Sequence, residues 1–145
     1  MRIQKISAIT LKIQDMKKEC QFYSQLPGLS LSYGGPDSNF TTFEMEDANN
    51  SNSKTYLNLE STNEFAGNKN FGRIIIYSDN VDELYNFFKK DNNIASIITI
   101  ENEPIDGMWG ERYFHILDPE EYEISFAQSI NKNKNNNKDK NLMVK

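Results

Sequence analysis

The sequence predicts an α+β fold made of two tandem β-α-β-β-β modules. In the stretch ITLKIQDMKKECQFYSQL, alternating apolar residues indicate a strand, and the residues after an acidic turn form an apolar stripe with helical spacing. Further along the chain, IIIYSDNVDELYNFFKKD repeats this pattern, so that Ile9 corresponds to Ile74 and Tyr23 to Phe88. Several strand-like segments follow each helix. We therefore expect one folding unit that occurs twice.

The predicted elements follow in the same order in both modules. The first module covers about residues 3–62. After its strand and helix, with breaks at GGPDS and EDANNSNSK, come the strands LSLSYGG, NFTTFEM and KTYLNLE. The second module covers about residues 70–128 and follows the linker STNEFAGNKN. After its strand and helix, with breaks at EPIDGMWG and DPEE, come ASIITIEN, ERYFHIL and YEISFAQ.

Consecutive strands after a helix favour antiparallel pairing, so each module should be a small curved sheet with its helix on the outer face. Side by side, the modules would form a curved, mostly antiparallel sheet around a central trough, where a ligand is expected. We expect a single domain over residues 1–130. Residues 131–145 are rich in Asn and Lys and predict a disordered tail, because such residues bury too little apolar area to offset the entropy of ordering.

Composition limits the classes of partner. The net charge is −5 although the tail is basic, so the rest of the chain is strongly acidic and should repel nucleic acid. No apolar run is long enough to span a membrane, so we expect no insertion into a membrane. The first residues lack the pattern of a signal peptide, and Cys20 is the single cysteine. These features favour a cytoplasmic protein.

Four segments in a fixed order carry a resemblance to a known family: DMKKECQFY, YLNLE, VDELY and WGERYFHILDPEEYEISFA. They resemble the vicinal oxygen chelate superfamily, which includes glyoxalases, extradiol dioxygenases, fosfomycin-modifying enzymes and bleomycin-binding proteins. The similarity covers about residues 3–128. It implies a homodimer and, in many members, one divalent metal ion held by His, Gln or Glu side chains from both modules.

The metal-ligand positions of the superfamily fall on Ala8, Arg73, Asn58 and Ser125 in this sequence. None of them is a ligand of the usual kind. Alanine has no donor atom, arginine repels a cation, and Asn or Ser oxygens bind divalent transition metals weakly compared with imidazole and carboxylate. The resemblance therefore implies a member without metal or other cofactor.

A set of polar and aromatic residues remains as the predicted ligand site: Trp109, Arg73, Arg112, Glu123, Tyr33, Asn58, His115 and Ser125. Trp109 lies between two glycines, which allow a tight turn and a ring that covers a cavity mouth, or else a ring that plugs the end of the core. Tyr33 precedes Gly34 and Gly35 and has the equivalent place in the first module. We expect the two rings to cap the ligand.

The remaining candidates have two interpretations each. Glu123 shares a face with Ser125, which the resemblance assigns to the trough, and it either forms an ion pair with Arg73 or Arg112 or orients the ligand together with Asn58. If Glu123 orients the ligand, we expect Arg73 or Arg112 to neutralise an acidic group of that ligand.

His115 shares a face of the strand RYFHIL with Tyr113 and Leu117, and it is either a hydrogen-bonded structural residue or a ligand contact.

Three functions are compatible with these residues. The first is metal-independent binding of a small organic molecule. The alternative is a lyase, isomerase or dioxygenase with a rearranged metal site made of His115, Glu123 and either Glu60 or Glu111. The third is an interaction module whose trough is filled by its own side chains or by a partner chain.

One turn departs from the pattern of the superfamily. Its members usually have Asp-Gly after the Asp-Pro of the final turn, whereas Glu120 and Glu121 follow Asp118 and Pro119 here. If that turn requires a positive φ, a glutamate adopts it at an energetic cost.

Overall fold

The computed structural model describes residues 1–2, 4–47, 49–64 and 72–130. Most of the predicted linker and the whole predicted tail lie outside these residues. The described chain contains the following elements: β1 (Ala8–Ile13), α1 (Met16–Tyr23), β2 (Leu29–Tyr33), β3 (Phe40–Asp47), β4 (Asn50–Ser61), β5 (Ile74–Tyr77), α2 (Val81–Lys90), α3 (Asn92–Ala95), β6 (Thr99–Ile100), β7 (Ile105–Asp106), β8 (Glu111–Leu117) and β9 (Glu123–Ser129).

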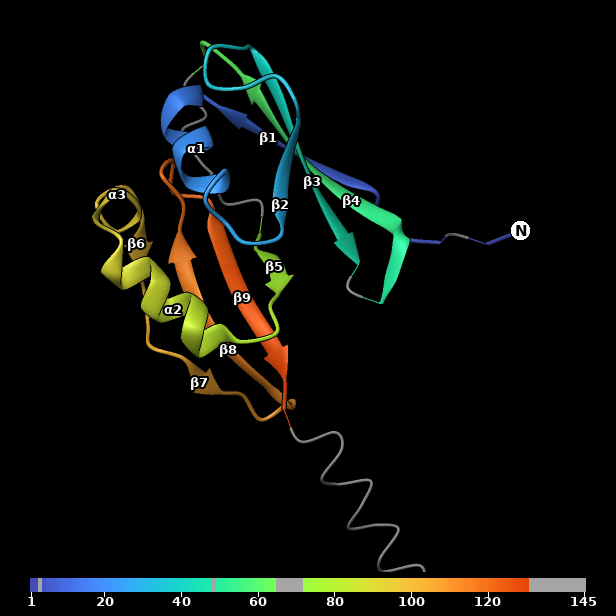
Figure 1. The fold of residues 1–145 in the computed structure, drawn as a ribbon, viewed down its shortest axis with the longest axis vertical. Helices are drawn as coiled ribbons and strands as arrows, with labels where there is room; N and C mark the ends of the chain where they lie inside the picture. Colours follow the sequence, from blue (N-terminus) through green and yellow to red (C-terminus); the bar gives the residue numbers. More distant parts are fainter. Residues whose placement is uncertain (3, 48, 65–71, 131–145) are drawn as a thin grey trace, which may run out of the picture.

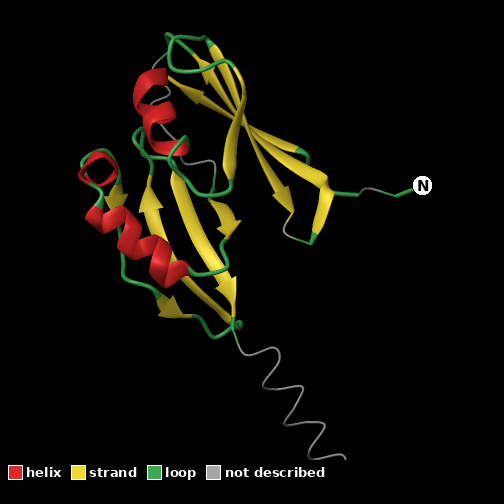
Figure 2. Cartoon of the chain, in the orientation of Figure 1, coloured by secondary structure: helices red, strands yellow, loops and turns green. Residues whose placement is uncertain are grey.

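The strands form two separate curved sheets, which have the same arrangement of their first and last strands (Figures 1 and 2). The first sheet has the order β1-β4-β3-β2, and the second has the order β5-β9-β8-β6 with β7 also paired to β8. In each sheet the module's first strand lies parallel to its last strand, and the other pairs are antiparallel. The predicted fold class is therefore confirmed.

The second module differs from the prediction after its long helix. The segment ASIITIEN was expected to be a strand, but Ala95 ends the short helix α3 and only Thr99 and Ile100 pair with β8. The side chain of Asp91 accepts hydrogen bonds from the backbone N–H groups of Asn93 and Ile94, which starts a new helical turn. A second short strand, β7, then pairs with the other end of β8.

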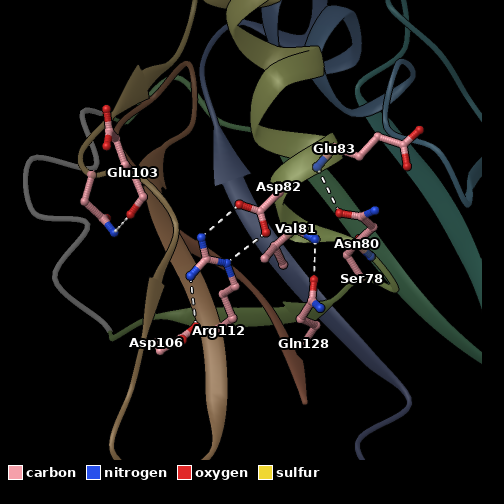
Figure 3. A network of polar contacts seen from close by, with 10 residues as sticks. Ser78, Asn80, Val81, Asp82, Glu83, Glu103, Asp106, Arg112 and Gln128 are labelled. Carbon is pink, nitrogen blue, oxygen red and sulfur yellow. Dashed lines mark hydrogen bonds and ion pairs between the residues drawn. The ribbon is translucent and has the colours of Figure 1, made fainter. Parts of the chain in front are cut away.

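Both long helices begin at an acidic or amide side chain that caps them. Asp15 accepts a hydrogen bond of 3.0 Å from the backbone N–H of Lys18 in α1. Asn80 accepts one of 3.0 Å from the backbone N–H of Glu83 in α2, as Figure 3 shows. Each cap satisfies a backbone donor that has no partner inside the helix, which explains why the helices start there.

The two modules share one apolar core, formed where their helices meet. Figure 1 shows α1 above α2 and α3, on the same side of the molecule. The ring of Phe22 in α1 lies 5.8 Å from that of Phe88 in α2, and Phe88 in turn contacts Phe114 of β8 and Phe126 of β9. Edge-to-face packing of these buried rings joins the modules. In the described parts of the chain, no helix is long and apolar enough to cross a membrane.

The turn between β8 and β9 does require a positive φ, and a glutamate instead of a glycine adopts it. Glu121 has φ of +71°. The carboxylate of Asp118 holds the turn by accepting hydrogen bonds of 2.9 Å from the backbone N–H groups of Glu120 and Tyr122. A left-handed conformation at a residue with a Cβ costs about 1–2 kcal/mol, and the contacts of Asp118 offset that cost.

Candidate functional site

Strand β8 has two faces with different roles. Phe114 and Ile116 are fully buried against the helices, and the rings of Tyr85 and Phe88 in α2 contact Phe114. The intervening side chains of β8 point to the opposite face, which we call the open face of the second sheet: Glu111, Tyr113 and His115, with their partners Ser129, Ala127 and Ser125 on β9. The site is built on this face.

A chain of polar contacts crosses the open face. Arg73, which immediately precedes β5, donates a hydrogen bond of 3.2 Å from Nη1 to Oγ of Ser125. The same oxygen lies 2.6 Å from Nδ1 of His115, the cross-strand neighbour of Ser125. Nη2 of Arg73 also lies 3.6 Å from a carboxylate oxygen of Glu123. Four of the predicted site residues, from three separate segments, thus meet at one point.

The surroundings of His115 favour its neutral form. Partial burial is the main cause that lowers its pKa from the ordinary value, and the positive charge of Arg73 adds to the effect. The carboxylates of Glu101 and Glu123 act in the opposite direction but do not outweigh the burial. At neutral pH the imidazole is therefore uncharged and has one nitrogen that donates and one that accepts.

An aromatic row continues the open face towards the loop before β8. The ring of Trp109 stacks on Tyr113 at 5.2 Å, and Tyr113 lies 4.9 Å from the ring of His115. Trp109 folds back over Gly107, where a Cβ would lie 2.7 Å from the indole ring. The glycine is therefore required for this ring position, and the indole remains 65% exposed at the end of the row.

Glu111 anchors the indole and was not among the predicted ligand-site residues. Its carboxylate accepts a hydrogen bond of 2.8 Å from Nε1 of Trp109 and another from the hydroxyl of Tyr77 on β5. Alternation along β8 places Glu111 on the same face as His115, which is the signal that the sequence contained. That Tyr77 reaches it depends on the position of β5 in the sheet.

An open hollow of about 620 Å³ lies beside this row. Tyr113 and His115 form one wall, and residues 101–105 form the other. The second wall is fixed to the strand, because the backbone N–H of His115 donates to Oδ1 of Asn102 and the backbone N–H of Glu101 donates to the carbonyl of His115. The hollow is large enough for a small organic molecule.

Two predicted site residues lie on the first sheet and not on this face. Tyr33 on β2 is 66% exposed and is paired with Thr42. Thr42 donates from Oγ1 to Oδ1 of Asn58, and Nδ2 of Asn58 donates to Oγ1 of Thr10 on β1. These residues form a polar row across the first sheet, opposite the face that packs on α1.

Arg112 lies on the helix side of β8, away from the other predicted site residues. Figure 3 shows its guanidinium between two aspartates. It donates to both carboxylate oxygens of Asp82 on α2, at 2.8 and 3.0 Å, and to Asp106 on β7 at 2.9 Å. These hydrogen bonds lower the pKa of Asp82 and raise that of Arg112. Arg112 thus links α2 to the paired strands β7 and β8.

The positions to which the resemblance assigns metal ligands do not offer a donor set for a divalent ion. The guanidinium of Arg73 lies against Ser125 and Glu123, where it would repel a cation. Asn58 uses its amide within the first sheet. Within the part of the chain that the structure describes, no group of three or more His, Cys, Asp or Glu side chains is placed to hold a metal ion.

Comparison with known proteins gives a family and a fold. The model of the Glyoxalase/Bleomycin resistance protein/Dioxygenase superfamily matches residues 5–126. No curated protein matches the sequence significantly.

Among solved structures, a glyoxalase family protein from Bacillus cereus superimposes with a TM-score of 0.60 and 13% identity, over 90% of this chain and 97% of that one. TioX from Micromonospora sp. ML1 has a TM-score of 0.60 and 17% identity, over 88% and 100% of the two chains. A family enzyme from Burkholderia phytofirmans PsJN has a TM-score of 0.62 and 16% identity, over 86% and 98%. At such low identity these likenesses establish the fold alone.

Proposed function

Because the chain belongs to the Glyoxalase/Bleomycin resistance protein/Dioxygenase superfamily, we propose that it binds a small organic molecule without a metal ion. The ligand lies on the open face of the second sheet. One observation carries this proposal: the guanidinium of Arg73, held by Ser125 and Glu123, supplies a fixed positive charge at a position to which the resemblance assigns a metal ligand. An arginine fork recognises a carboxylate or a similar acidic group directly.

The hydrogen-bonding state of His115 gives it a role in this binding. Ser125 accepts from Arg73, so its hydroxyl hydrogen is available to Nδ1 of His115. We assign the tautomer that uses this bond, which leaves the hydrogen of the imidazole on Nε2. His115 then offers the ligand a neutral donor next to the charge of Arg73.

The aromatic row defines the shape of the ligand. The stacked rings of Trp109 and Tyr113 continue to His115 and offer flat apolar surfaces beside the hollow, which suit a planar molecule. Glu101 and Glu103 line the far wall and favour hydrogen-bond donors on that end of the ligand. The ligand class is therefore a planar organic acid with a donor group remote from the acid.

We also propose that the functional unit is a homodimer in the cytoplasm, without a nucleic-acid or membrane partner. Strand β5 is the edge of the second sheet, and its Ile75 and Tyr77 are 62% and 65% exposed. Next to them, an apolar groove of about 580 Å³ between the modules is lined by Ile6 and Ile9. An exposed apolar edge of this kind supports docking of a second copy. A light-scattering mass of one chain at micromolar concentration would contradict the dimer.

Thermal-shift measurements on metal-stripped protein test the binding proposal. The probes are benzoate, 4-aminobenzoate and their amides in one arm and divalent metal ions in the other. We expect the carboxylates to raise the melting temperature, because a ligand that binds the native state stabilises it by mass action, and 4-aminobenzoate to do so more than benzoate. We expect Arg73→Gln to abolish the shift and Trp109→Ala to reduce it.

Arg112→Gln is the matched control, because it removes an arginine from the opposite face of the same sheet. It should lower the melting temperature of the free protein but leave the ligand-induced shift unchanged. Stabilisation by a divalent metal alone, or a carboxylate shift that survives Arg73→Gln, would overturn the proposal.

A further inference from the structure

Glu111, the first residue of β8, holds two aromatic side chains at once. Oε1 of its carboxylate accepts a hydrogen bond of 2.8 Å from Nε1 of Trp109. Oε2 accepts a second hydrogen bond from the hydroxyl of Tyr77, the last residue of β5. A tryptophan has one hydrogen-bond donor, and the carboxylate takes it, which fixes the direction in which the indole points. We call Glu111 and these two partners the clamp.

The clamp joins two strands that do not pair with each other, because β9 lies between β5 and β8. On the β5 side, Ala127 of β9 is the neighbour of Tyr77. On the β8 side, Ser129 of β9 is the neighbour of Glu111. Neighbours in register point to the same face of a sheet, and the short side chains of Ala and Ser leave room above β9 for the tyrosine and the glutamate to meet. The clamp therefore crosses the open face.

The loop before β8 brings Trp109 to the clamp. The backbone N–H of Gly107 donates to the carbonyl of Glu111 at 2.7 Å, and the N–H of Gly110 donates to the carbonyl of Gly107 at 3.2 Å. These bonds close a tight turn with φ of +92° at Gly110, which glycine adopts without strain. The turn fixes the backbone of Trp109, and Glu111 fixes its side chain.

The position of Trp109 matters to the ligand through Tyr113. The indole stacks on Tyr113 with 30° between the two ring planes. Tyr113 in turn forms a wall of the hollow together with His115. A stacked partner restricts the rotation of the tyrosine ring, so the wall of the hollow keeps a flat surface.

We propose that Glu111 is a positioning residue that sets the shape specificity of the ligand site: its clamp holds Trp109 on Tyr113, and the flat wall that results favours planar acids over puckered ones. This inference rests on the proposed binding of an organic acid to the open face. A planar ring that stacks on a fixed ring gains up to about tenfold in affinity over a puckered ring, which touches the wall with fewer atoms.

Strand β5 separates this role from recognition of the acid. Arg73 immediately precedes β5 and Tyr77 ends it, and alternation places both side chains on the open face. Four residues of extended strand span about 13 Å, so the guanidinium and the clamp lie at opposite ends of the site. Loss of the clamp should therefore leave the contact of Arg73 with Ser125 in place and change only the selection of shape.

The first measurement uses the free protein, because the chain has one tryptophan and its indole N–H gives a single signal in proton–nitrogen correlation NMR. We expect Glu111→Ala to move that signal towards the position of an indole in water and to speed its exchange with water by about tenfold. Glu111→Gln keeps an oxygen that accepts from the indole and should retain most of the protection. Glu83→Ala, which removes an exposed glutamate of α2, is the control and should leave the signal unchanged.

The second measurement compares benzoate with cyclohexanecarboxylate in calorimetric titrations, since the two acids have the same charge and nearly the same size. Wild-type protein should bind benzoate up to about tenfold more tightly. Glu111→Ala should bring the ratio close to one, and Glu111→Gln should restore most of it. Tyr77→Phe keeps the ring and removes only the hydroxyl, so it should lower the ratio in part, and it tests the clamp even if Glu111→Ala does not fold. Arg73→Gln should weaken the binding of both acids.

The failures of the two proposals are distinguishable. An indole signal that is the same in wild-type protein, Glu111→Ala and Tyr77→Phe would overturn the clamp. A preference for benzoate that survives in these variants would overturn the specificity role of Glu111. Wild-type protein that has a protected indole but binds neither acid would overturn the proposed function, and the specificity role with it, while the clamp would stand.

Discussion

His115 shows how single residues set the chemistry of the site. It is the only histidine of the chain, and it lies between a serine that fixes its orientation and an arginine that opposes its protonation. A histidine in solution is partly charged near pH 6.5, whereas this one is held neutral by burial and by the charge of Arg73. Its use as a neutral donor depends on both neighbours.

The pKa of His115 is directly measurable, because one imidazole gives unambiguous NMR signals. We expect the wild-type midpoint below 6.5 and an upward shift in Arg73→Gln, since removal of a positive charge makes protonation easier. The group destabilises the folded protein as pH falls from about 6.5 through the lowered pKa, because the unfolded chain binds the proton more readily.

Arg112→Gln is the control for this titration, since Arg112 lies on the other face of β8 and contacts Asp82 and Asp106. It should leave the midpoint of His115 unchanged. A wild-type midpoint above 6.5, or equal shifts in both variants, would refute the assigned arrangement.

At the scale of elements, the β8–β9 hairpin carries most of the site. Its strands alternate between a face buried against α2 and the open face, so every second residue is available to a ligand. Its turn is held by Asp118 and requires a left-handed residue at Glu121. The hairpin is thus a rigid support with one strained position.

Relief of that strain should stabilise the protein. In Glu121→Gly, the steric cost of φ near +71° disappears, while the added flexibility of the unfolded chain cancels part of the gain. We expect the free energy of unfolding to rise by up to about 1 kcal/mol, measured by urea denaturation.

Glu121→Ala separates the backbone effect from the charge. It keeps the Cβ that causes the strain and removes only the exposed carboxylate, so the stability should change little. Equal stabilisation by both substitutions would mean that repulsion between carboxylates, not backbone strain, limits the turn.

On the scale of the whole molecule, the shared core makes the two modules one cooperative unit. Phe88 is fully buried and contacts Phe22 from the first module and both strands of the hairpin from the second. Loss of its ring would leave a cavity that the surrounding side chains fill only in part. Both modules should be weakened together.

We expect Phe88→Ala to lower the free energy of unfolding by about 3–5 kcal/mol and to keep a single transition in circular dichroism. Its neighbour Phe87 is 36% exposed and is the matched control, with an expected loss well below that of Phe88→Ala. Two separate transitions, or equal losses for the two variants, would show that the modules do not share a core.

Local patterns were sufficient for most of the fold. The repeated strand and helix and the period of two in ERYFHIL depend on neighbours in the sequence, and the structure has them where they were expected. The prediction of a strand over ASIITIEN was wrong, because Asp91 starts another helical turn before the strand. A short apolar run does not distinguish a buried helical turn from a strand.

The site was predictable only as a set of candidates. Alternation alone places His115 on one face of β8 and Arg112 on the other, but it does not say which face a helix covers. The packing of α2 on Phe114 decided that, and it left Arg73 rather than Arg112 on the open face. Asn58 likewise lies on the first sheet, in a row that its strand order determines.

The sequence by itself determined the two modules and the family, because these follow from residue types and their local spacing. Only the tertiary structure decided which side chains meet: Arg73 with Ser125, and Tyr23 with Asp118. Such contacts join residues far apart in the chain, and they depend on strand register and on the packing of helices between modules. No local pattern encodes those two quantities.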